Sequence, residues 1–230
     1  MTTFTSSFGV FSKIAKKRYG LCILNYIVTS NHIHLLLKAG EKRDVIARSI
    51  QLIASRSARG YNIRKNRSGA FWEDHYHATA VQTGKYLIQC LIYIDLNMVR
   101  ARVVRHPSQW PFGGYHEIFS DRQRYRIIDT KKLLEMLEIE NIKTYRKIHG
   151  KRINDAICCP DLARKNHWTE SVAVGSEKFA AEIKSTLGLK AYYRKIEKEE
   201  GLYTLREKGD FYKKAVFAHE MEHLRHYLTG

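Results

Sequence analysis

Two histidines separated by a single residue are the first feature of this chain that could do chemistry. They are His32 and His34, in the stretch TSNHIHLLLK of residues 29–38, and an apolar run follows them directly. Alternate side chains of a β-strand point to the same face, with Cα atoms about 7 Å apart, so the two imidazoles could converge on one metal ion. The alternative is a pair of half-buried histidines that form hydrogen bonds at a strand end.

A tyrosine and an asparagine four residues apart form a second candidate group. Tyr93 and Asn97 belong to the stretch YLIQCLIYIDLNMVRA, residues 86–101. On a helix they would share one face, about a turn apart. An amide oxygen is a hard ligand for a divalent cation, and a phenol nearby could attack a phosphorus that the cation polarises. A tyrosine in an apolar stretch is also typical of a core position, with its hydroxyl group hydrogen-bonded.

The charge of the chain predicts an anionic partner. The net charge is +17 and the pI is near 9.7, which favours nucleic acid because neutralised phosphates release counterions. The alternative is a generally basic, solvated surface. The residues expected to contact phosphates lie in and after a predicted helix and at the end of the tyrosine helix. They are Arg56, Arg59, Arg64, Lys65, Arg67, Arg100 and Arg102.

Membrane and secreted proteins are disfavoured by the sequence. No apolar run approaches the roughly 20 residues that span a bilayer. The N-terminal stretch MTTFTSSFGVFSKIAKKRYG lacks the basic start, apolar core and cleavage site of a signal peptide. We therefore expect no membrane association and a cytoplasmic, nucleoid-associated location. The cysteines form no C-x-x-C pair and predict no disulfide framework.

Hydrophobic periodicity and turn residues predict strands and helices up to about residue 120 and a helical region beyond it. Residues 21–28 and 32–38 should form an antiparallel hairpin around the turn residues TSN. A further strand is expected over residues 71–81, whereas residues 105–119, with two prolines and two adjacent glycines, should be irregular. Helices are expected over residues 8–18, 43–60, 84–101, 130–139, 176–188 and 210–228.

Four stretches, in order and spacing, resemble the HUH single-tyrosine transposases, and most closely their REP-associated branch. They are SNHIHLLL, GAFWEDHYH, KYLIQCLIYIDLNMVRARVV and HPSQWPFGGYH. The family phrases run approximately P-N-H-V-H-L-L, G-x-x-W-x-x-R-Y-H, Y-I-x-L-N-P-V-R-A-G-L-V and P-x-x-Y-x-W-S-S-Y. The resemblance extends over about residues 20–118, so it is much more specific than H-x-H alone.

The resemblance implies a role for each matched residue. His32 and His34 match two metal ligands, Asn97 matches the third, and Tyr93 matches the nucleophile. The implied cofactor is Mg²⁺ or Mn²⁺. Members of the family cleave and rejoin single-stranded DNA beside imperfect palindromic hairpins, through a 5′-phosphotyrosine and a free 3′-hydroxyl. The substrate implied for this chain is therefore single-stranded DNA that carries such hairpins.

The predicted fold class is α+β. Residues 1–120 should form a ferredoxin-like (RRM-like) palm with an antiparallel sheet, and residues 121–230 a helical C-terminal region. The family usually has a strand ahead of its first helix, whereas this chain begins at that helix. The alternatives are a palm without its first strand or a strand encoded upstream of Met1. The chain could be a monomer or a homodimer.

Rival interpretations remain at two motifs and for the function as a whole. The stretch HEMEH, residues 219–223, fits the H-E-x-x-H pattern of zinc peptidases, although Glu222 and the apolar pattern around it favour an ordinary amphipathic helix. His75 and His77 repeat the alternate spacing of the first pair, and a structural strand position is favoured for them. The main alternative function is a DNA hairpin-binding protein that has lost catalysis.

Overall fold

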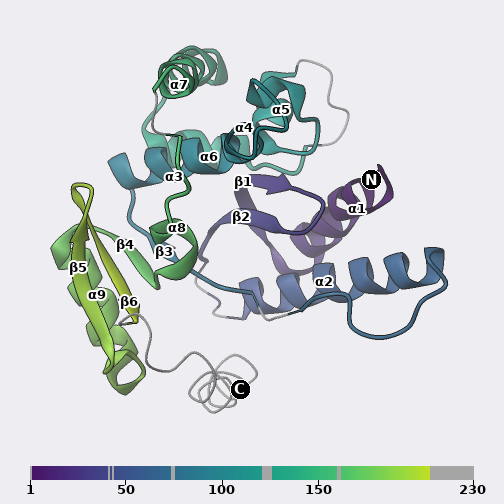
Figure 1. Ribbon diagram of the computed structural model, residues 1–230, viewed down its shortest axis with the longest axis horizontal. Helices are drawn as coiled ribbons and strands as arrows, with labels where there is room; N and C mark the ends of the chain where they lie inside the picture. The colour runs from purple at the N-terminus through teal and green to yellow at the C-terminus, as the bar shows by residue number, and fades with distance from the viewer. Residues whose placement is uncertain are drawn as a thin grey trace. The chain divides into compact units, whose positions relative to one another are not determined.

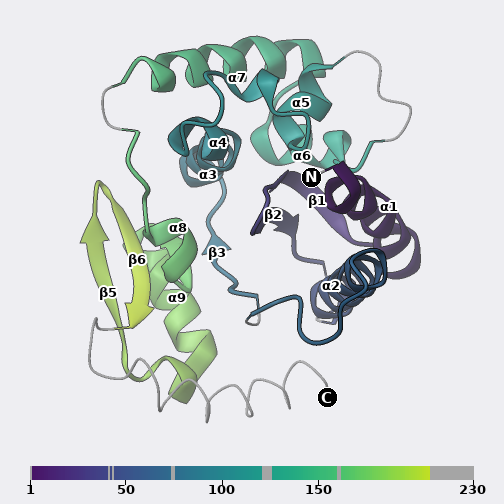
Figure 2. The same ribbon diagram turned by 45° about the vertical axis from the view of Figure 1, so that its right-hand side comes forward.

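The chain folds into two compact units, shown in Figures 1 and 2. A computed structural model describes residues 2–40, 42, 44–73, 76–120, 126–159 and 162–207. Unit 1 consists of Met1–His75 and Leu91–Leu162, and unit 2 of Tyr76–Cys90 and Ala163–Gly230. The chain therefore leaves unit 1, enters unit 2 and returns before its final passage into unit 2.

Helices and strands alternate in the described part of the chain, and this mixture confirms the α+β class. The α-helices are α1 (Thr2–Tyr19), α2 (Val45–Arg64), α3 (Lys85–Asp95), α4 (Asn97–Arg100), α5 (Gly114–Phe119), α6 (Thr130–Leu137), α7 (Ile142–Ile157), α8 (His167–Glu170) and α9 (Glu177–Leu187). The strands are β1 (Cys22–Val28), β2 (Ile33–Lys38), β3 (Ala80–Val81), β4 (Ala173–Gly175), β5 (Arg194–Glu199) and β6 (Leu202–Glu207). Two short 3₁₀ helices are η1 (Pro107–Gln109) and η2 (Gly188–Ala191).

The predicted hairpin is confirmed as β1 and β2. Helix α1 ends at Gly20, whose φ of 78° is the left-handed conformation that glycine adopts readily at a helix end. The two strands then pair antiparallel, with Ile27 opposite His34. The register shifts between Ile23 and Asn25, so β1 carries a bulge at this point. A bulge bends a strand and redirects its side chains.

The two strands of the hairpin differ in their surroundings. Six of the seven β1 residues are buried, whereas β2 is mostly half-buried. The outer edge of β1 is covered, because the Val28 amide donates to the Phe112 carbonyl at 2.9 Å and Ile27 bridges to Gly113. Within the described residues, β1 is the only strand that pairs with β2. Among the described residues, the hairpin therefore forms a sheet of two strands.

Of the strand predicted over residues 71–81, the described residues form only β3, where Ala80 and Val81 pair with β4. Residues just before it fold back on α2 instead. The Trp72 indole donates to the Ala54 carbonyl at 3.1 Å, and the Phe71 ring lies 4.7 Å from that of Tyr61. These aromatic contacts hold the segment against a helix, so it has no strand partner there.

The helix predicted over residues 84–101 is present but interrupted. Helix α3 ends at Asp95, Leu96 forms a turn, and α4 begins at Asn97. The segment predicted to be irregular contains the short helix α5. Helix α7, which the periodicity did not predict, begins at Asn141, whose side chain accepts from the Thr144 amide at 2.9 Å.

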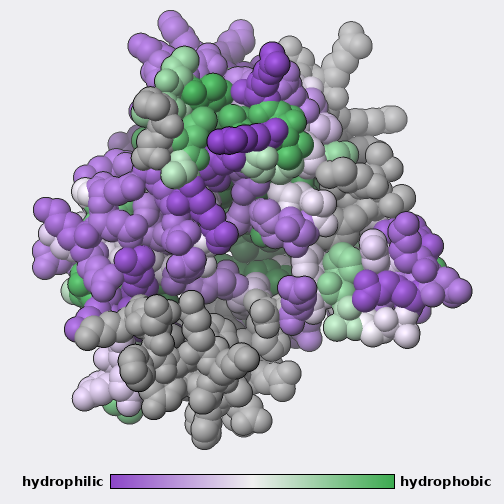
Figure 3. Space-filling model, in the orientation of Figure 1, coloured by the Kyte–Doolittle hydropathy of each residue, from purple (hydrophilic) through white to green (hydrophobic). Residues whose placement is uncertain are grey.

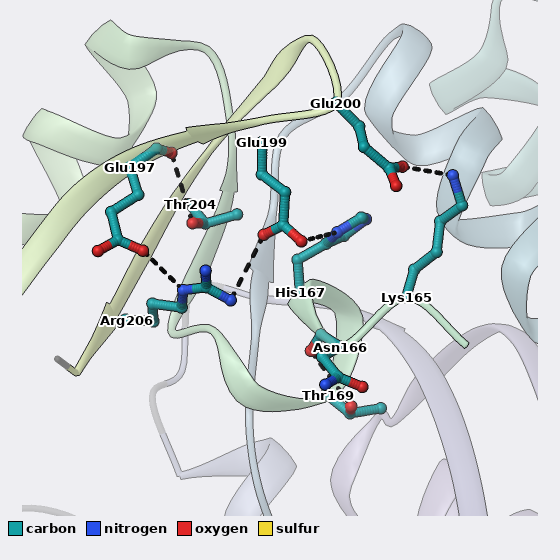
Figure 4. A network of polar contacts seen from close by, with 9 residues as sticks. All are labelled: Lys165, Asn166, His167, Thr169, Glu197, Glu199, Glu200, Thr204 and Arg206. Carbon is teal, nitrogen blue, oxygen red and sulfur yellow. Dashed lines mark hydrogen bonds and ion pairs between the residues drawn. The ribbon is translucent and has the colours of Figure 1, made fainter. Parts of the chain in front are cut away.

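Unit 2 contains a four-stranded sheet in the order β3-β4-β6-β5. β3 pairs parallel with β4, and the other neighbours are antiparallel. The hairpin β5–β6 turns at Glu200 and Gly201, which have φ values of 48° and 78°, as a type I′ turn requires. Figure 4 shows the ion pairs around this hairpin, among them Arg206 with Glu197 at 2.8 Å.

The C-terminal half is therefore not helical throughout. α6 and α9 confirm two predicted helices, whereas β4, β5 and β6 were not predicted. The helix predicted over residues 210–228 lies outside the described residues. The domain boundary predicted near residue 120 falls inside unit 1, which is defined by the contacts between its residues. A separate catalytic domain of residues 1–120 therefore stays a prediction.

Among the residues that the structure describes, no helix is long and apolar enough to cross a membrane. Purple, hydrophilic side chains cover much of the face seen in Figure 3.

Candidate functional site

The turn between β1 and β2 fixes the backbone of His32. The Thr29 amide donates to the His32 carbonyl at 3.0 Å, and the Thr29 hydroxyl donates to the same carbonyl at 2.9 Å. The His32 amide in turn approaches the Thr29 hydroxyl oxygen at 3.1 Å. Threonine thus closes the turn with its own side chain, as turn residues commonly do.

The imidazole of His32 is oriented by its neighbours. Its Nδ1 lies 2.8 Å from Oδ1 of Asn31 and 3.1 Å from the Thr29 hydroxyl. An amide oxygen can only accept, so Nδ1 carries the hydrogen in this contact. In the neutral ring, Nε2 then has the lone pair, which is the form of imidazole that binds metals.

His34 lies beside His32, as the strand spacing predicts. The two ring centroids are 4.8 Å apart, with the rings at 68°. His34 also faces the tyrosine helix, because its ring centroid lies 6.1 Å from that of Tyr93. The two imidazoles therefore lie together on the side of the hairpin that meets α3.

Asn97 and Tyr93 complete the cluster in unit 1. Nδ2 of Asn97 lies 3.5 Å from Nε2 of His32. Tyr93 is buried, whereas Asn97 is half-buried and His32 is exposed, so the cluster runs from the core to the surface. Two segments some sixty residues apart thus bring together the four residues that the sequence singled out: His32, His34, Tyr93 and Asn97.

Two of the predicted phosphate-binding arginines lie close to this cluster in the chain. The Arg100 guanidinium is stacked over the Tyr93 ring, 4.0 Å from its centroid. Arg102 follows α4 in a left-handed conformation with φ of 58°. With Val99 and Val104, Arg102 lines a hollow on the surface of unit 1. Arg100 is therefore at the site, and Arg102 lies just beyond the end of α4.

The chemical types of the donor groups in the cluster are ones that divalent cations accept. They comprise two imidazoles, one with its lone pair directed at Asn97, and the amide of Asn97, which has a hard oxygen donor. Within the described residues, no group of three or more histidine, cysteine, aspartate or glutamate residues could hold a metal ion. The role of Asn97 as a third metal ligand therefore stays a prediction.

The other predicted basic residues lie in the C-terminal part of α2 and in the loop that follows it. The loop after the helix is folded, because the Asn62 amide donates to the Gly69 carbonyl at 2.9 Å and Arg67 donates to the Ala70 carbonyl at 2.9 Å. Arg59, Asn62 and Arg67 line a shallow hollow there. The exposed basic side chains of this end are Arg56, Arg59, Arg64, Lys65 and Arg67.

The rival motifs find no support in the described residues. His77 belongs to unit 2, where its Nε2 lies 3.0 Å from the Ser171 carbonyl, a contact that suits a structural role. His75 and the HEMEH stretch lie outside the described residues. No disulfide joins any two of the cysteines, which are all among the described residues: Cys22, Cys90, Cys158 and Cys159.

Several supporting residues escaped the sequence analysis. Thr29 and Asn31, read only as turn residues, hold His32 in place. Asp95 is a charged residue within an apolar helix, and this unusual position is the feature of the sequence that could have identified it. It is 4% exposed and binds Asn25 and His149.

Comparison with known proteins gives one match. Residues 5–97 match the family described as "Transposase IS200 like". The matched segment ends at Asn97 and includes the other three residues of the cluster. No curated protein and no solved structure gave a significant match. The assignment to the REP-associated branch stays a prediction.

Proposed function

Because residues 5–97 belong to the IS200-like transposase family, we propose that this protein cuts and rejoins single-stranded DNA with Tyr93 as its nucleophile. The substrate is single-stranded DNA beside an imperfect palindromic hairpin. The match to this family supports a general role in DNA transposition. The single-stranded substrate, the hairpin and the nucleophile are the proposed refinements.

One observation carries the proposal: the phenol of Tyr93 lies beside the histidine pair. The Tyr93 ring is 6.1 Å from that of His34, and His32 is 3.5 Å from Asn97. A structural role for the histidines would not call for a tyrosine and an amide at the same place. A nucleophile beside a set of cation-binding atoms is what phosphoryl transfer requires.

The proposed reaction is an exchange of ester bonds. The Tyr93 oxygen forms a bond to phosphorus, and the bond from phosphorus to the 3′ oxygen breaks. The hydroxyl proton leaves Tyr93 for solvent, and the departing 3′ oxygen takes up a proton. The products are a 5′-phosphotyrosine and a free 3′-hydroxyl, and attack by a 3′-hydroxyl on the phosphotyrosine reverses the step and rejoins DNA.

The chain's own residues prepare this step. His32, His34 and Asn97 would hold Mg²⁺ or Mn²⁺, and Asn31 and Thr29 keep Nε2 of His32 directed to the site. The bound cation supplies a Lewis acid that stabilises negative charge on the phosphate oxygens. Arg100, stacked on the Tyr93 ring, adds positive charge beside the position of the scissile phosphate.

The basic end of α2 is proposed to hold the DNA backbone. Its arginines and lysine are exposed, and the loop that carries Lys65 and Arg67 is fixed by hydrogen bonds to its own carbonyl groups. A folded basic surface loses less conformational entropy on binding than a flexible one. These residues would contribute affinity rather than chemistry.

The decisive experiment looks for a covalent adduct. The protein is incubated with a hairpin-flanked single-stranded oligonucleotide labelled at its 5′ or its 3′ end. A denaturation-resistant adduct should form only with the label 3′ of the cut. Tyr93→Phe removes one oxygen atom and should eliminate the adduct, whereas the matched control Tyr86→Phe, on the same helix, should retain it.

Two results would contradict this assignment. An adduct that survives in Tyr93→Phe would transfer the role to another residue. An adduct carrying the 5′ label would reverse the polarity of the proposed cleavage.

A second candidate function is a hairpin-binding protein without catalysis. The observation that favours it is the half-buried strand β2, which pairs with a single strand among the described residues. An incomplete sheet would hold His34 less firmly. Tight hairpin binding by wild-type protein without any adduct would favour this function.

A further inference from the structure

A chain of buried polar groups lies behind the tyrosine helix. Oδ1 of Asp95 accepts from Nδ2 of Asn25 at 2.9 Å, and Oδ2 accepts from Nε2 of His149 at 2.7 Å. The three residues are 4%, 1% and 2% exposed. Both carboxylate oxygens are thus engaged in the interior of unit 1, where breaking a hydrogen bond to a charge is costly.

Asp95, the last residue of α3, lies midway in sequence between Tyr93 of α3 and Asn97 of α4. Successive helical residues are about 100° apart, so Tyr93 and Asn97 lie within about 40° of one another and Asp95 lies on the opposite side. The backbone ladder continues past the turn, because the Leu96 amide donates to Ile92 at 3.0 Å and Arg100 donates to Leu96 at 2.9 Å. The hydrogen bonds to Asp95 therefore fix the rotation of the helix about its axis, and with it the direction of the face that carries Tyr93 and Asn97.

Asn25 connects Asp95 to the hairpin of β1 and β2. It follows the bulge of β1 and pairs with Leu36 of β2, the strand that carries His34. Room for its side chain depends on Gly114, because a Cβ at that position would overlap the Asn25 amide oxygen. The Asn25 amide thus joins the sheet of the histidines directly to the helix of the tyrosine.

His149 anchors the other side of Asp95. Its ring stacks on Tyr145 of the same helix, with centroids 5.0 Å apart and an angle of 12°. Burial, with a further contribution from the Asp95 charge, raises the pKa of Tyr115 to about 12 and also raises that of Tyr145. Helix α7, which begins after the segment matched by the family, supplies this support.

We propose that Asp95 and His149 are positioning residues, which hold Tyr93 and Asn97 against the histidine pair from behind. This inference rests on the proposed function. All members of the polar chain are buried, so they do not touch DNA. They act by orienting the residues that do, and supporting residues of this kind typically contribute 10- to 100-fold to activity or metal affinity.

The test separates orientation from packing. For His149→Ala we expect the single-turnover rate of adduct formation at saturating hairpin DNA to fall about 10- to 100-fold. The Kd for the hairpin should change less than about threefold, because the DNA surface is untouched. His149→Gln places an amide N–H near the position of Nε2 and should restore the rate to within about threefold.

A matched control comes from unit 2, where His167 is also buried next to a carboxylate, Glu199. His167→Ala should leave the rate of adduct formation unchanged. An unchanged rate in His149→Ala would overturn the inference. Equal losses in His149→Ala and His149→Gln would overturn it too, because they would point to packing alone.

A second variant covers the case in which His149→Ala does not fold. The double substitution Asp95→Leu with His149→Leu replaces the polar pair with apolar side chains, a change that often preserves folding. The folded double variant should also lose about 10- to 100-fold in rate, and a wild-type rate would refute the positioning role. No adduct from wild type would overturn the proposed function and this inference together.

Discussion

Each unit buries a histidine beside a carboxylate, and the two pairs differ in what surrounds them. In unit 1, His149 donates to Asp95 at 2.7 Å, and Asn25 engages the other carboxylate oxygen. In unit 2, Nδ1 of His167 lies 3.7 Å from a Glu199 carboxylate that is 30% exposed and also pairs with Arg206 (Figure 4). The same two residue types thus form a directional, buried contact in one unit and a long, partly solvated one in the other.

The difference between the two histidine–carboxylate pairs indicates where the orientation of side chains matters. A buried carboxylate with both oxygens engaged has one favourable geometry, whereas a solvated ion pair tolerates several. The rigid pair lies behind the cluster proposed for chemistry. The tolerant pair belongs to a unit that holds none of the four cluster residues.

The largest difference between substitutions in the two units is expected for DNA cleavage. His32→Ala should reduce DNA cleavage below detection, because a proposed metal ligand is lost, while hairpin binding stays nearly intact. In wild-type protein, chelation should stop cleavage and manganese or magnesium should restore it. His77→Ala, in unit 2, is the matched control and should cleave normally. Cleavage that persists in excess chelator would remove the metal from the mechanism.

The next contrast concerns folding stability. Asp95→Ala should lower the free energy of unfolding by about 3 to 5 kcal/mol, because His149 and Asn25 lose a buried partner. Glu199→Ala should lower it by no more than about 1 kcal/mol, since Arg206 keeps Glu197 as a partner and the 3.7 Å approach of His167 to Glu199 is longer than a hydrogen bond. Denaturant titrations measure both changes. Equal losses would mean that the two pairs are equivalent after all.

A smaller contrast is expected for DNA affinity. Replacing Arg64 and Lys65 with glutamine should reduce the slope of log affinity against log salt concentration by about 0.7 to 0.9 units per lost phosphate contact. The same replacement of Lys195 and Lys198, exposed on β5 of unit 2, should leave the slope unchanged. Titrations of a labelled hairpin at several salt concentrations provide the measurement. A reversed result would assign the DNA surface to unit 2.

The smallest contrast is a pH dependence in unit 2. Burial lowers the pKa of His167 below its usual 6.5, against a smaller opposing effect of Glu199. The unfolded chain therefore binds the proton more readily, so this contribution to stability is complete above about pH 6.5 and is lost as the pH falls below it. His167→Phe should flatten the decline in thermal stability below pH 6.5. An unchanged decline would exclude His167 as its source.

Sequence predicted which four side chains lie together better than it predicted the fold around them. The spacing of His32 and His34 on a strand, and of Tyr93 and Asn97 on a helix, depends only on local geometry. Each pair can therefore be identified from the order of residues alone. Their meeting required the family resemblance, because no local rule joins residue 32 to residue 97.

The wrong or missing predictions of helices and strands have two causes, which are contacts between residues distant in the sequence and weak local patterns of apolar residues. Trp72 binds α2, and this turned a predicted strand into a folded-back segment. The strand β5 reads RKIEKE, with too few apolar residues to reveal its alternation. The pairing of Asp95 with His149 spans 54 positions, and only the folded chain brings the two together.

The threading of the chain between the units has a consequence for deletion studies. The chain enters unit 2 at Tyr76 and leaves it at Cys90, so β3 reaches its partner β4 only after more than ninety further residues. A stop codon near residue 120 would remove β4 and leave β3 without this partner. A truncated gene product of this kind would be a target for proteases and chaperones, and its inactivity would say nothing about the chemistry of Tyr93.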